Sequence, residues 1–289
     1  MQHSSDVVGL VLARPARMLG IEPFFAEFIA GLEERLSADG RSLLLRVVAD
    51  HAAEMAEYRR WAGGSMIEAV VVANLHTGDL RVPLLLELGL PAVAVGGTAD
   101  GMAISNMWVD NAQAVTDAVT CLAHLGHEHI ARVSGPKELH HTRLRDEAFA
   151  AECERRSIRS AVIPADYSEE SGRDATLALL RVPQGPTAII YDNDVMALAG
   201  LAVAATIGRK VPTDLSILAW DDSTLCRLSN PSLSAMTLDV HGLGIQTAGA
   251  LLDTLAGSAA KVYQVQPPHL SMRGSTAVAD LSRAGVAPK

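Results

Sequence analysis

The stretch TAIIYDNDVMALAGLAVAATIGRKVPTDLSILAWDD, residues 187–222, decides the fold of this chain. It opens with an apolar run rich in β-branched residues, 187–191, which predicts a buried strand. An almost entirely apolar helix is expected over residues 195–207, and Gly208 is a typical helix end. Residues 211–214 then turn the chain into a second buried strand, 215–220. This strand–helix–strand crossover predicts two neighbouring parallel strands.

Polar residues follow both of these strands. Asp192, Asn193 and Asp194 come directly after the first strand, where they are also placed to cap the next helix, and Asp221 and Asp222 follow the second. In open α/β sheets, ligands bind outside the carboxyl ends of the strands. The stretch therefore predicts a ligand-binding edge.

Length and composition favour a compact protein of two lobes. A chain of 289 residues, 49% of them hydrophobic, is able to bury a sizeable core, which argues against disorder. Lys and Arg total 24 against 33 Asp and Glu, which gives a net charge of −9. A surface of that sign repels phosphate backbones, so we expect the chain by itself to bind nucleic acid poorly.

The cysteines and the N-terminal sequence favour a soluble cytoplasmic protein. Cys121, Cys153 and Cys226 are few and well separated, which is typical of reduced thiols. The N-terminus lacks the basic start and long apolar core of a signal peptide. The apolar run 195–207 is shorter than the about 20 residues that a bilayer requires, so no membrane span is expected.

Short apolar runs alternate with amphipathic stretches along the chain, which indicates βαβ units and a mostly parallel sheet. An eight-stranded barrel is one arrangement of such units. Two open-sheet lobes are favoured, because the strands fall into two sets of comparable size and residues 104–111 between them have an extended character of their own. The expected strands cover residues 7–13, 43–49, 69–75, 92–95, 130–134, 161–164, 188–191 and 216–220.

Candidate ligand contacts also follow strands in the first half of the chain. Phe24 and Phe25 stand at the start of an amphipathic helix, 26–37, near the end of the first strand. Core packing explains one of them, but aromatic residues are only 4% of the chain, so an adjacent pair at a strand end suggests that at least one faces a ligand. Asn74 and His76 end the third strand in the same way.

Arg145 is the candidate cation of the second half. A helix is expected over residues 142–157, which places Arg143 and Arg145 in its first turn, where a positive charge opposes the helix dipole. An arginine at that electrostatic cost is a candidate for a bidentate grip on a polar ligand. The alternative is a salt bridge to Glu147 or a neighbouring acid.

Motifs for catalysis and for cofactor binding were sought without success. The sequence contains no phosphate-binding loop, dinucleotide fingerprint or GxSxG elbow. The histidine pairs at 127/129 and 140/141 lack the spacing of a zinc-binding helix, and no cysteine lies near them. Asp221 and Asp222 are adjacent, so on a strand they point to opposite faces. We therefore expect no catalytic residue, no metal site and no cofactor.

Five blocks occur in a specific order and spacing: LGHEHIARVSGP (125–136), RLRDEAF (143–149), AIIYDNDVMALAGLAVAATIGRKVPTDLSILAWDDS (188–223), NPSLSAMTLDVHGLG (230–244) and PPHLSMRGST (267–276). This pattern resembles the effector-binding region of the lactose-repressor family of bacterial transcription regulators. The resemblance covers about residues 7–277, nearly the whole chain.

The resemblance implies an α/β fold of two doubly wound parallel-sheet lobes joined by three crossings, like a type I periplasmic binding protein. The N-terminal lobe is expected at residues 7–107 plus 240–267, and the C-terminal lobe at 108–239 plus 268–282. A small effector, usually a sugar, binds between the lobes and shifts their hinge. Lobe faces form a homodimer, and a separate N-terminal helix-turn-helix headpiece reads the operator.

Matching positions imply individual ligand contacts. Phe24 and Phe25 touch the ligand from the first lobe, Arg145 grips ring hydroxyls or carbonyls, and Tyr167 stacks on the ligand. Asn193 and Asp221 take sugar hydroxyls from the second lobe, and His141 occupies a weaker polar site. With the two strand-end residues above, the expected ligand-binding set is Phe24, Phe25, Asn74, His76, His141, Arg145, Tyr167, Asn193 and Asp221.

The chain also departs from the family pattern. Ala148 stands where the family usually has Gly, and Ala219-Trp220 stand where it has Gly followed by Phe or Tyr. Gly96-Gly97 replace a more polar end of the fourth strand, which implies that one ligand contact is lost there. Residues 1–6 leave no room for a headpiece, and Ser4-Ser5-Asp6 resemble the linker after a removed one.

A periplasmic sugar-binding protein of a transport system is the alternative of the same fold. The VPxDxSIxxWDD and RGST blocks match regulators better. The sequence leaves open which effector binds, whether it induces or co-represses, which operator is read, and whether the assembly is a dimer or a tetramer.

Overall fold

The structure is a computed structural model and describes residues 6–15 and 22–279. It divides the chain into two compact units. Unit 1 is Met1–Val109 with Asp239–Gln266, and unit 2 is Asp110–Leu238 with Pro267–Lys289, so the chain passes between the units three times. Residues 1–5, most of the segment interpreted as a linker remnant, lie outside the described residues.

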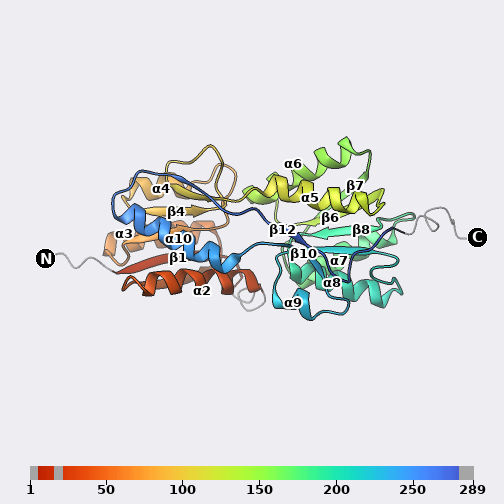
Figure 1. The fold of residues 1–289 in the computed structure, drawn as a ribbon. Helices are drawn as coiled ribbons and strands as arrows, with labels where there is room; N and C mark the ends of the chain where they lie inside the picture. The colour runs from red at the N-terminus through yellow and green to blue at the C-terminus, as the bar shows by residue number, and fades with distance from the viewer. Residues whose placement is uncertain (1–5, 16–21, 280–289) are drawn as a thin grey trace, which may run out of the picture. The chain divides into compact units, whose positions relative to one another are not determined.

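Unit 1 contains a six-stranded parallel sheet in the order β11-β5-β4-β3-β1-β2, flanked by helices (Figure 1). Its elements are β1 (Val7–Ala13), α2 (Pro23–Ser37), β2 (Ser42–Val48), α3 (His51–Gly64), β3 (Ala69–Val72), α4 (Arg81–Glu87), β4 (Ala92–Val95), β5 (Ser105–Trp108), α10 (Val240–Leu255) and β11 (Val262–Gln264).

Two glycines bring α2 and α10 into close contact within unit 1. A Cβ added at Gly31 would lie 2.0 Å from the carbonyl oxygen of His241, and one added at Gly244 would lie 2.3 Å from that of Phe28. Other side chains would hold the two helix backbones apart. On α3, Tyr58 and Trp61 are fully buried in an apolar cluster with β3 and α4.

Unit 2 contains a second six-stranded sheet, in the order β12-β10-β9-β8-β6-β7. Its strands are parallel except where β12 pairs antiparallel with β10. Its elements are α5 (Asn111–His124), β6 (His129–Ser134), α6 (His140–Arg155), β7 (Arg159–Pro164), α7 (Glu169–Arg181), β8 (Ala188–Tyr191), α8 (Asp194–Thr206), β9 (Ser216–Trp220), α9 (Thr224–Leu228), β10 (Ser234–Thr237) and β12 (His269–Ser271).

Both faces of this second sheet are buried. Ile130 and Ile190 belong to the apolar cluster that includes α5 and α6, whereas Ala131 and Ile189 belong to the cluster that includes α7 and α8. Figure 1 shows these two helix pairs on opposite sides of the sheet. A strand with helices on both faces needs apolar residues at every position, which explains the continuous apolar runs in the sequence.

Side-chain caps fix where several helices begin. The side chain of the residue before the helix accepts a hydrogen bond from a backbone N–H of the first turn, and this satisfies a donor that the helix leaves open. These caps are Asp50 on α3, Asp110 on α5, Ser168 on α7, Asn193 on α8 and Asp239 on α10.

Each of the eight predicted strands has a counterpart, and the sheet arrangement confirms two open sheets rather than a barrel. The third strand ends at Val72, earlier than predicted. Four strands were not predicted as such: β5, which lies in the segment noted as extended, and β10, β11 and β12. The predicted start of α6 at Thr142 is wrong, because the helix begins at His140.

Candidate functional site

Five of the predicted site residues lie in unit 2. Asn193 is the second residue after Tyr191, the last residue of β8, and Asp221 directly follows Trp220, the last residue of β9. Tyr167 lies in the loop after β7, and His141 and Arg145 lie in the first two turns of α6, which follows β6. The carboxyl ends of parallel strands meet at one sheet edge, so the fold brings these residues to the same edge.

A buried ion pair supports this edge from below. Arg132, on β6, donates to Asp192 through Nε at 2.8 Å and through Nη2 at 2.6 Å, and it also pairs with Asp146. The backbone N–H of Gly135 donates to the same Asp192 carboxylate at 3.1 Å. Burial would raise the pKa of Asp192, yet Arg132 and Arg145 hold that pKa below its ordinary value. Asp192 is therefore an anion on which two arginines converge.

Arg145 contacts three groups within unit 2. Its Nε donates to Asn111 Oδ1 at 2.8 Å, its Nη1 lies 3.8 Å from Asp192 Oδ2, and its guanidinium carbon lies 3.9 Å from the centre of the Trp220 ring. The expectation that Arg145 lies in the first turn of its helix is wrong, because α6 begins at His140 and Arg145 is in the second turn. The dipole argument therefore does not apply. Arg143, which is in the first turn, pairs with Glu147 at 3.7 Å.

Tyr167 is held in one position by its hydroxyl and by its backbone. The hydroxyl oxygen lies 2.9 Å from His141 Nε2 and 3.4 Å from Thr142 Oγ1. The residue has a φ of 70°, in the left-handed region, and a Cβ added at Gly135 would lie 2.1 Å from its hydroxyl oxygen. Burial and the nearby Arg145 lower the pKa of His141 to about 3, so His141 is neutral at ordinary pH.

Both the oxygen and the nitrogen of the Asn193 side-chain amide form hydrogen bonds within unit 2. Its Oδ1 accepts from the backbone N–H of Met196 at 2.9 Å, and its Nδ2 donates to the carbonyl oxygen of Tyr167 at 3.0 Å. The side chain therefore caps α8, as its position in the sequence indicated, and also fixes the loop that contains Tyr167. One amide hydrogen and one acceptor lone pair are left for a ligand.

Asp221 differs from the other acids of this edge because no described residue donates a hydrogen bond to its carboxylate. Its φ of 65° is left-handed, so the chain turns sharply where β9 ends. Burial first, and then the charge of Asp194, raise the pKa of Asp221 to about 7, while Arg145 opposes the shift. The neighbouring Asp222 points elsewhere, accepting from Arg273 Nη2 at 2.6 Å and from Thr237 Oγ1 at 3.0 Å.

In unit 1, Phe25 is a core residue and Phe24 is the more available ring. Phe25 is 4% exposed, and the guanidinium of Arg14 lies 4.3 Å from the centre of its ring. Phe24 is partly exposed and packs on Phe25 and Phe28, with ring centres 5.2 and 6.2 Å away. This agrees with the expectation that one ring of the pair packs in the core.

A buried charged cluster holds the chain after β3, where Asn74 lies. Arg81 donates to Asn74 O at 2.8 Å, to Glu54 Oε1 at 2.8 Å and to Asp79 Oδ2 at 2.6 Å. Tyr58 donates to Glu54 Oε1 at 2.6 Å. Burial would raise the pKa of Asp79, but Arg81 lowers it to about 2. The cluster fixes Asn74 in a left-handed conformation with φ 51°.

His76 faces another histidine from the same part of unit 1. Its Nε2 lies 2.6 Å from Nε2 of His51, the first residue of α3, and the ring centres are 3.8 Å apart. One ring nitrogen must donate and the other accept. Burial and Arg81 lower the pKa of His51. The predicted residues Asn74 and His76 therefore share one loop, which the buried cluster supports.

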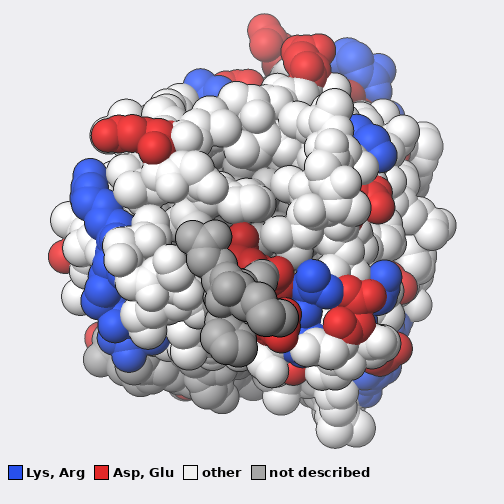
Figure 2. Space-filling view, turned by 90° about the vertical axis from the view of Figure 1, so that its left-hand side faces the viewer, with Lys and Arg blue, Asp and Glu red and all other residues white. Residues whose placement is uncertain are grey.

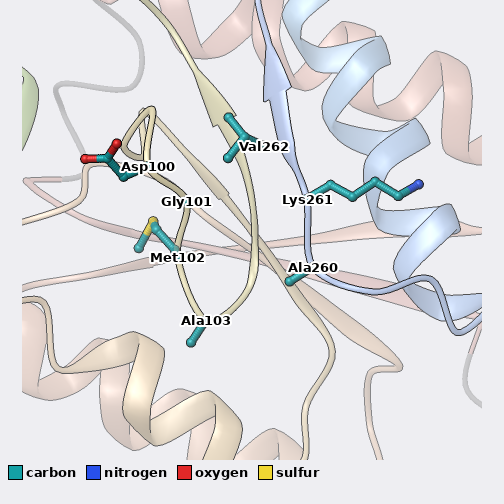
Figure 3. Close-up of a pocket in the computed structure, with 7 residues that line it drawn as sticks. All are labelled: Asp100, Gly101, Met102, Ala103, Ala260, Lys261 and Val262. Atoms are coloured by element: carbon teal, nitrogen blue, oxygen red, sulfur yellow. The ribbon is translucent and has the colours of Figure 1, made fainter.

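A separate pocket of unit 1 is lined by residues 100–103 and 260–262 (Figure 3). In Figure 3 the Lys261 side chain extends away from the other lining residues, and its ammonium lies 3.7 Å from Asp253 on α10. The pocket contains none of the predicted site residues. Within the described residues, no group of three or more His, Cys, Asp or Glu is placed to hold a metal ion. In the same part of the chain, no helix is both long and apolar enough to cross a membrane.

Sequence reasoning missed Arg132, Asn111 and Trp220 as parts of this edge and gave Asp192 no role beyond a cap. A signal existed for Arg132, because a charged residue inside the apolar run IARVS needs a buried counter-charge. Nothing in the sequence identifies Asp192, which lies 60 residues further along the chain, as the partner of Arg132. For Trp220, the last residue of a buried strand, no signal indicated contact with an arginine.

Comparison with known proteins gives consistent matches. The family model for a periplasmic binding protein-like domain matches residues 119–276, more than half of the chain. A LacI family transcriptional regulator from Bifidobacterium animalis subsp. lactis is 35% identical with a TM-score of 0.86, over 95% of this chain and 98% of that chain.

Two further matches have more specific names. A structure of the transcriptional regulator CelR in complex with cellobiose is 26% identical with a TM-score of 0.84, over 94% of this chain and 84% of that chain. The transcriptional repressor CytR of Escherichia coli K12 is 28% identical over 88% of this chain and 76% of its own length.

Proposed function

The chain belongs to the lactose-repressor (LacI) family of transcription regulators, and from that premise we propose that it is the ligand-sensing core of a bacterial repressor. The ligand is a small effector, a sugar or a derivative of one. It binds at the carboxyl edge of the unit 2 sheet and contacts unit 1 as well. Its binding changes the hinge between the units, and a DNA-binding headpiece responds to that change.

The side chains of the unit 2 edge support a hydroxyl-bearing ligand. Asp221 offers carboxylate oxygens that accept from hydroxyl groups. Arg145 has Nη2 left as a donor to ring or hydroxyl oxygens, since its contacts with Asn111, Asp192 and Trp220 use Nε, Nη1 and one face of the guanidinium. The related CelR is solved in complex with cellobiose, which supports a sugar as the class of effector. Asn193 adds its remaining amide hydrogen, and Tyr167 an aromatic surface.

From unit 1, we propose that Phe24, Asn74 and His76 contact the effector, with Phe25 packing beneath Phe24. An effector that touches groups of both units favours the arrangement in which those contacts form together. Only such a differential interaction moves a conformational equilibrium. The difference between the effector's binding free energies for the two hinge states is the free energy by which it shifts their equilibrium.

We further propose that the chain forms a homodimer and that the operator is contacted by a helix-turn-helix headpiece rather than by these two units. On the face drawn in Figure 2, acidic and basic side chains are interspersed among uncharged ones, and the chain has a net charge of −9. A phosphate-binding face requires an excess of Lys and Arg. Leu86 of α4, 51% exposed, is a candidate dimer contact.

The observation that supports this proposal best is the open carboxylate of Asp221 at the edge where Arg145 lies. The test is a thermal-shift screen of monosaccharides, disaccharides, sugar phosphates and sugar acids, followed by calorimetry on the best ligand. Arg145→Ala should weaken its binding by about 1.5–3 kcal/mol, the scale of a hydrogen bond to a charged group. The matched control is Arg143→Ala, which removes the same charge from an exposed position of the same helix.

Circular dichroism must show that both variants are folded, because Arg145 is 8% exposed and also bonds to Asn111. Equal affinities of wild type and a folded Arg145→Ala protein would show that the site is wrongly placed. A screen in which no compound raises the melting temperature or binds by calorimetry would contradict the effector class.

A further inference from the structure

We infer that the effector is an uncharged, hydroxyl-rich molecule and that this site rejects the phosphorylated and acidic forms of the same sugar. The inference rests on the proposed function, because it assumes that the effector binds at the Arg145–Asp221 edge of unit 2. It goes further by naming the charge of the ligand, which follows from the charges that are already compensated at this edge.

The cations at this edge already have anionic partners. Arg132 donates hydrogen bonds to Asp192 through Nε and Nη2 and to Asp146 through Nη1. Arg145 lies beside Asp192 and covers the Trp220 ring. A phosphate or carboxylate binds well where arginine or lysine is free to pair with it. Here such a ligand would have to compete with Asp192, which is fully buried and holds both guanidinium groups.

The carboxylates, in contrast, are not fully compensated. Asp221 receives no hydrogen bond from a described residue. Asp194, at the first position of α8, is 2% exposed, and its Oδ2 has no hydrogen-bond partner. A ligand at this edge therefore meets open acceptors on Asp221, and the charge of the buried Asp194 acts on the same carboxylate. Hydroxyl groups satisfy such acceptors, whereas an anionic ligand brings further negative charge to them.

The change of ligand affinity with pH, caused by the ionisation of Asp221, provides a second test of the ligand charge. The groups that act on Asp221 are Asp194 from α8, Asp192 after β8, Arg145 from α6, Tyr167 after β7 and Cys226 from α9. Burial raises the pKa of Asp221 to about 7, and those of Tyr167 and Cys226 to about 12, so of these three groups only Asp221 changes charge near neutral pH.

The sign of the pH dependence separates the two ligand classes. Hydroxyl groups that donate to Asp221 favour its ionised form, so an uncharged sugar should bind more tightly as the pH rises. An anion favours the protonated form, so its affinity should fall as the pH rises. For a group with a pKa of about 7, the ionised fraction rises about tenfold between pH 6 and pH 8, which sets the expected change in affinity.

The experiment is calorimetry at pH 6 and pH 8 with matched probes: cellobiose and glucose as neutral sugars, and glucose 6-phosphate and glucuronate as anions. The neutral probe that binds best, including any better neutral sugar from the screen, is compared with its own phosphate and acid forms. We expect the neutral form to bind at least tenfold more tightly than the charged forms. We also expect its affinity to rise about tenfold from pH 6 to pH 8.

Variants separate the effect of Asp221 from the effects of other charged groups. Asp221→Asn should bind the neutral probe more weakly and remove most of the pH dependence. Asp174→Asn, which changes the same charge at an exposed position of α7, should keep the wild-type pH dependence.

The inference is overturned if a phosphate or acid probe binds more tightly than its neutral form, or if the neutral probe loses affinity as the pH rises. In those cases the proposed effector site still stands if Arg145→Ala, but not Arg143→Ala, weakens binding of the same probe. If no probe binds, whether neutral or charged, the proposed function and this inference fail together.

Discussion

Replacement of Asp192 by Asn should destabilise unit 2 strongly, because it removes one negative charge on which two buried cations depend. Arg132 donates to Asp192 with two nitrogens, and Arg145 lies 3.8 Å from the same carboxylate. Asn has nearly the same shape, so packing is preserved. However, the NH₂ group of Asn would face one of the N–H donors that the Asp192 carboxylate accepts from, and the positive charges of Arg132 and Arg145 would remain.

The expected loss is near the lower end of the range for a broken buried pair. Removing one partner of a buried ion pair costs about 3–5 kcal/mol. Asp146 still pairs with Arg132 in the variant, so part of the charge stays compensated. We therefore expect the free energy of unfolding of unit 2 to fall by about 3 kcal/mol.

Urea denaturation gives the midpoint and slope, and hydrogen exchange of the β6 and β8 amides reports on unit 2 separately. Asp174→Asn is the charge-matched surface control and should change stability by less than about 0.5 kcal/mol. A loss below about 1 kcal/mol for Asp192→Asn, with unchanged β6 and β8 exchange, would refute the view that Asp192 holds the two arginines in place.

Three further predictions follow from other contacts. Gly135→Ala should cost about 1–3 kcal/mol, since its Cβ would lie 2.1 Å from the Tyr167 hydroxyl. Gly63→Ala in α3, whose Cβ meets no atom within 4 Å, should not lower the stability measured by urea denaturation, because alanine favours a helix more than glycine does. Burial lowers the pKa of His141 in the folded state to about 3, below its value in the unfolded chain. The neutral ring therefore contributes to the free energy of unfolding above pH 6.5, and this contribution is lost as the pH falls. Between pH 7.5 and pH 5 the wild type should lose about 2 kcal/mol more stability than His141→Gln. The chain should sediment as a dimer at tens of micromolar and Leu86→Arg as a monomer; a monomeric wild type would contradict the dimer.

The strand edges were predictable because they depend on local patterns. The apolar run 188–191 and the polar residues after it gave both the end of β8 and the cap of α8, since buried strands and N-caps have short sequence signatures. Arg145 was placed in the wrong turn for a related reason. The residue before α6 is Leu139, whose side chain forms no cap, so nothing local marks the start of that helix.

The charged support of both units was not predictable, because it joins residues that are far apart in the chain. Arg132 and Asp192 are separated by 60 residues, and Glu54 and Arg81 by 27. An apolar pattern predicts that such a residue is buried but does not identify its counter-charge. Only the sheet order, which brings β6 beside β8, pairs Arg132 with Asp192.

Backbone conformation and packing explain why the two residues after β4 are glycines. The family resemblance implied that Gly96 and Gly97 replace a more polar strand end and that a ligand contact is lost there. Gly96 has a φ of 82°, which favours glycine at that turn. A Cβ at Gly97 would lie 2.3 Å from Oδ1 of Asn106, a fully buried residue of β5. Because Asn106 fills the space that a side chain at residue 97 would need, the two glycines are requirements of the unit 1 backbone. The absence of a side chain there follows from packing, whether or not the effector reaches that turn.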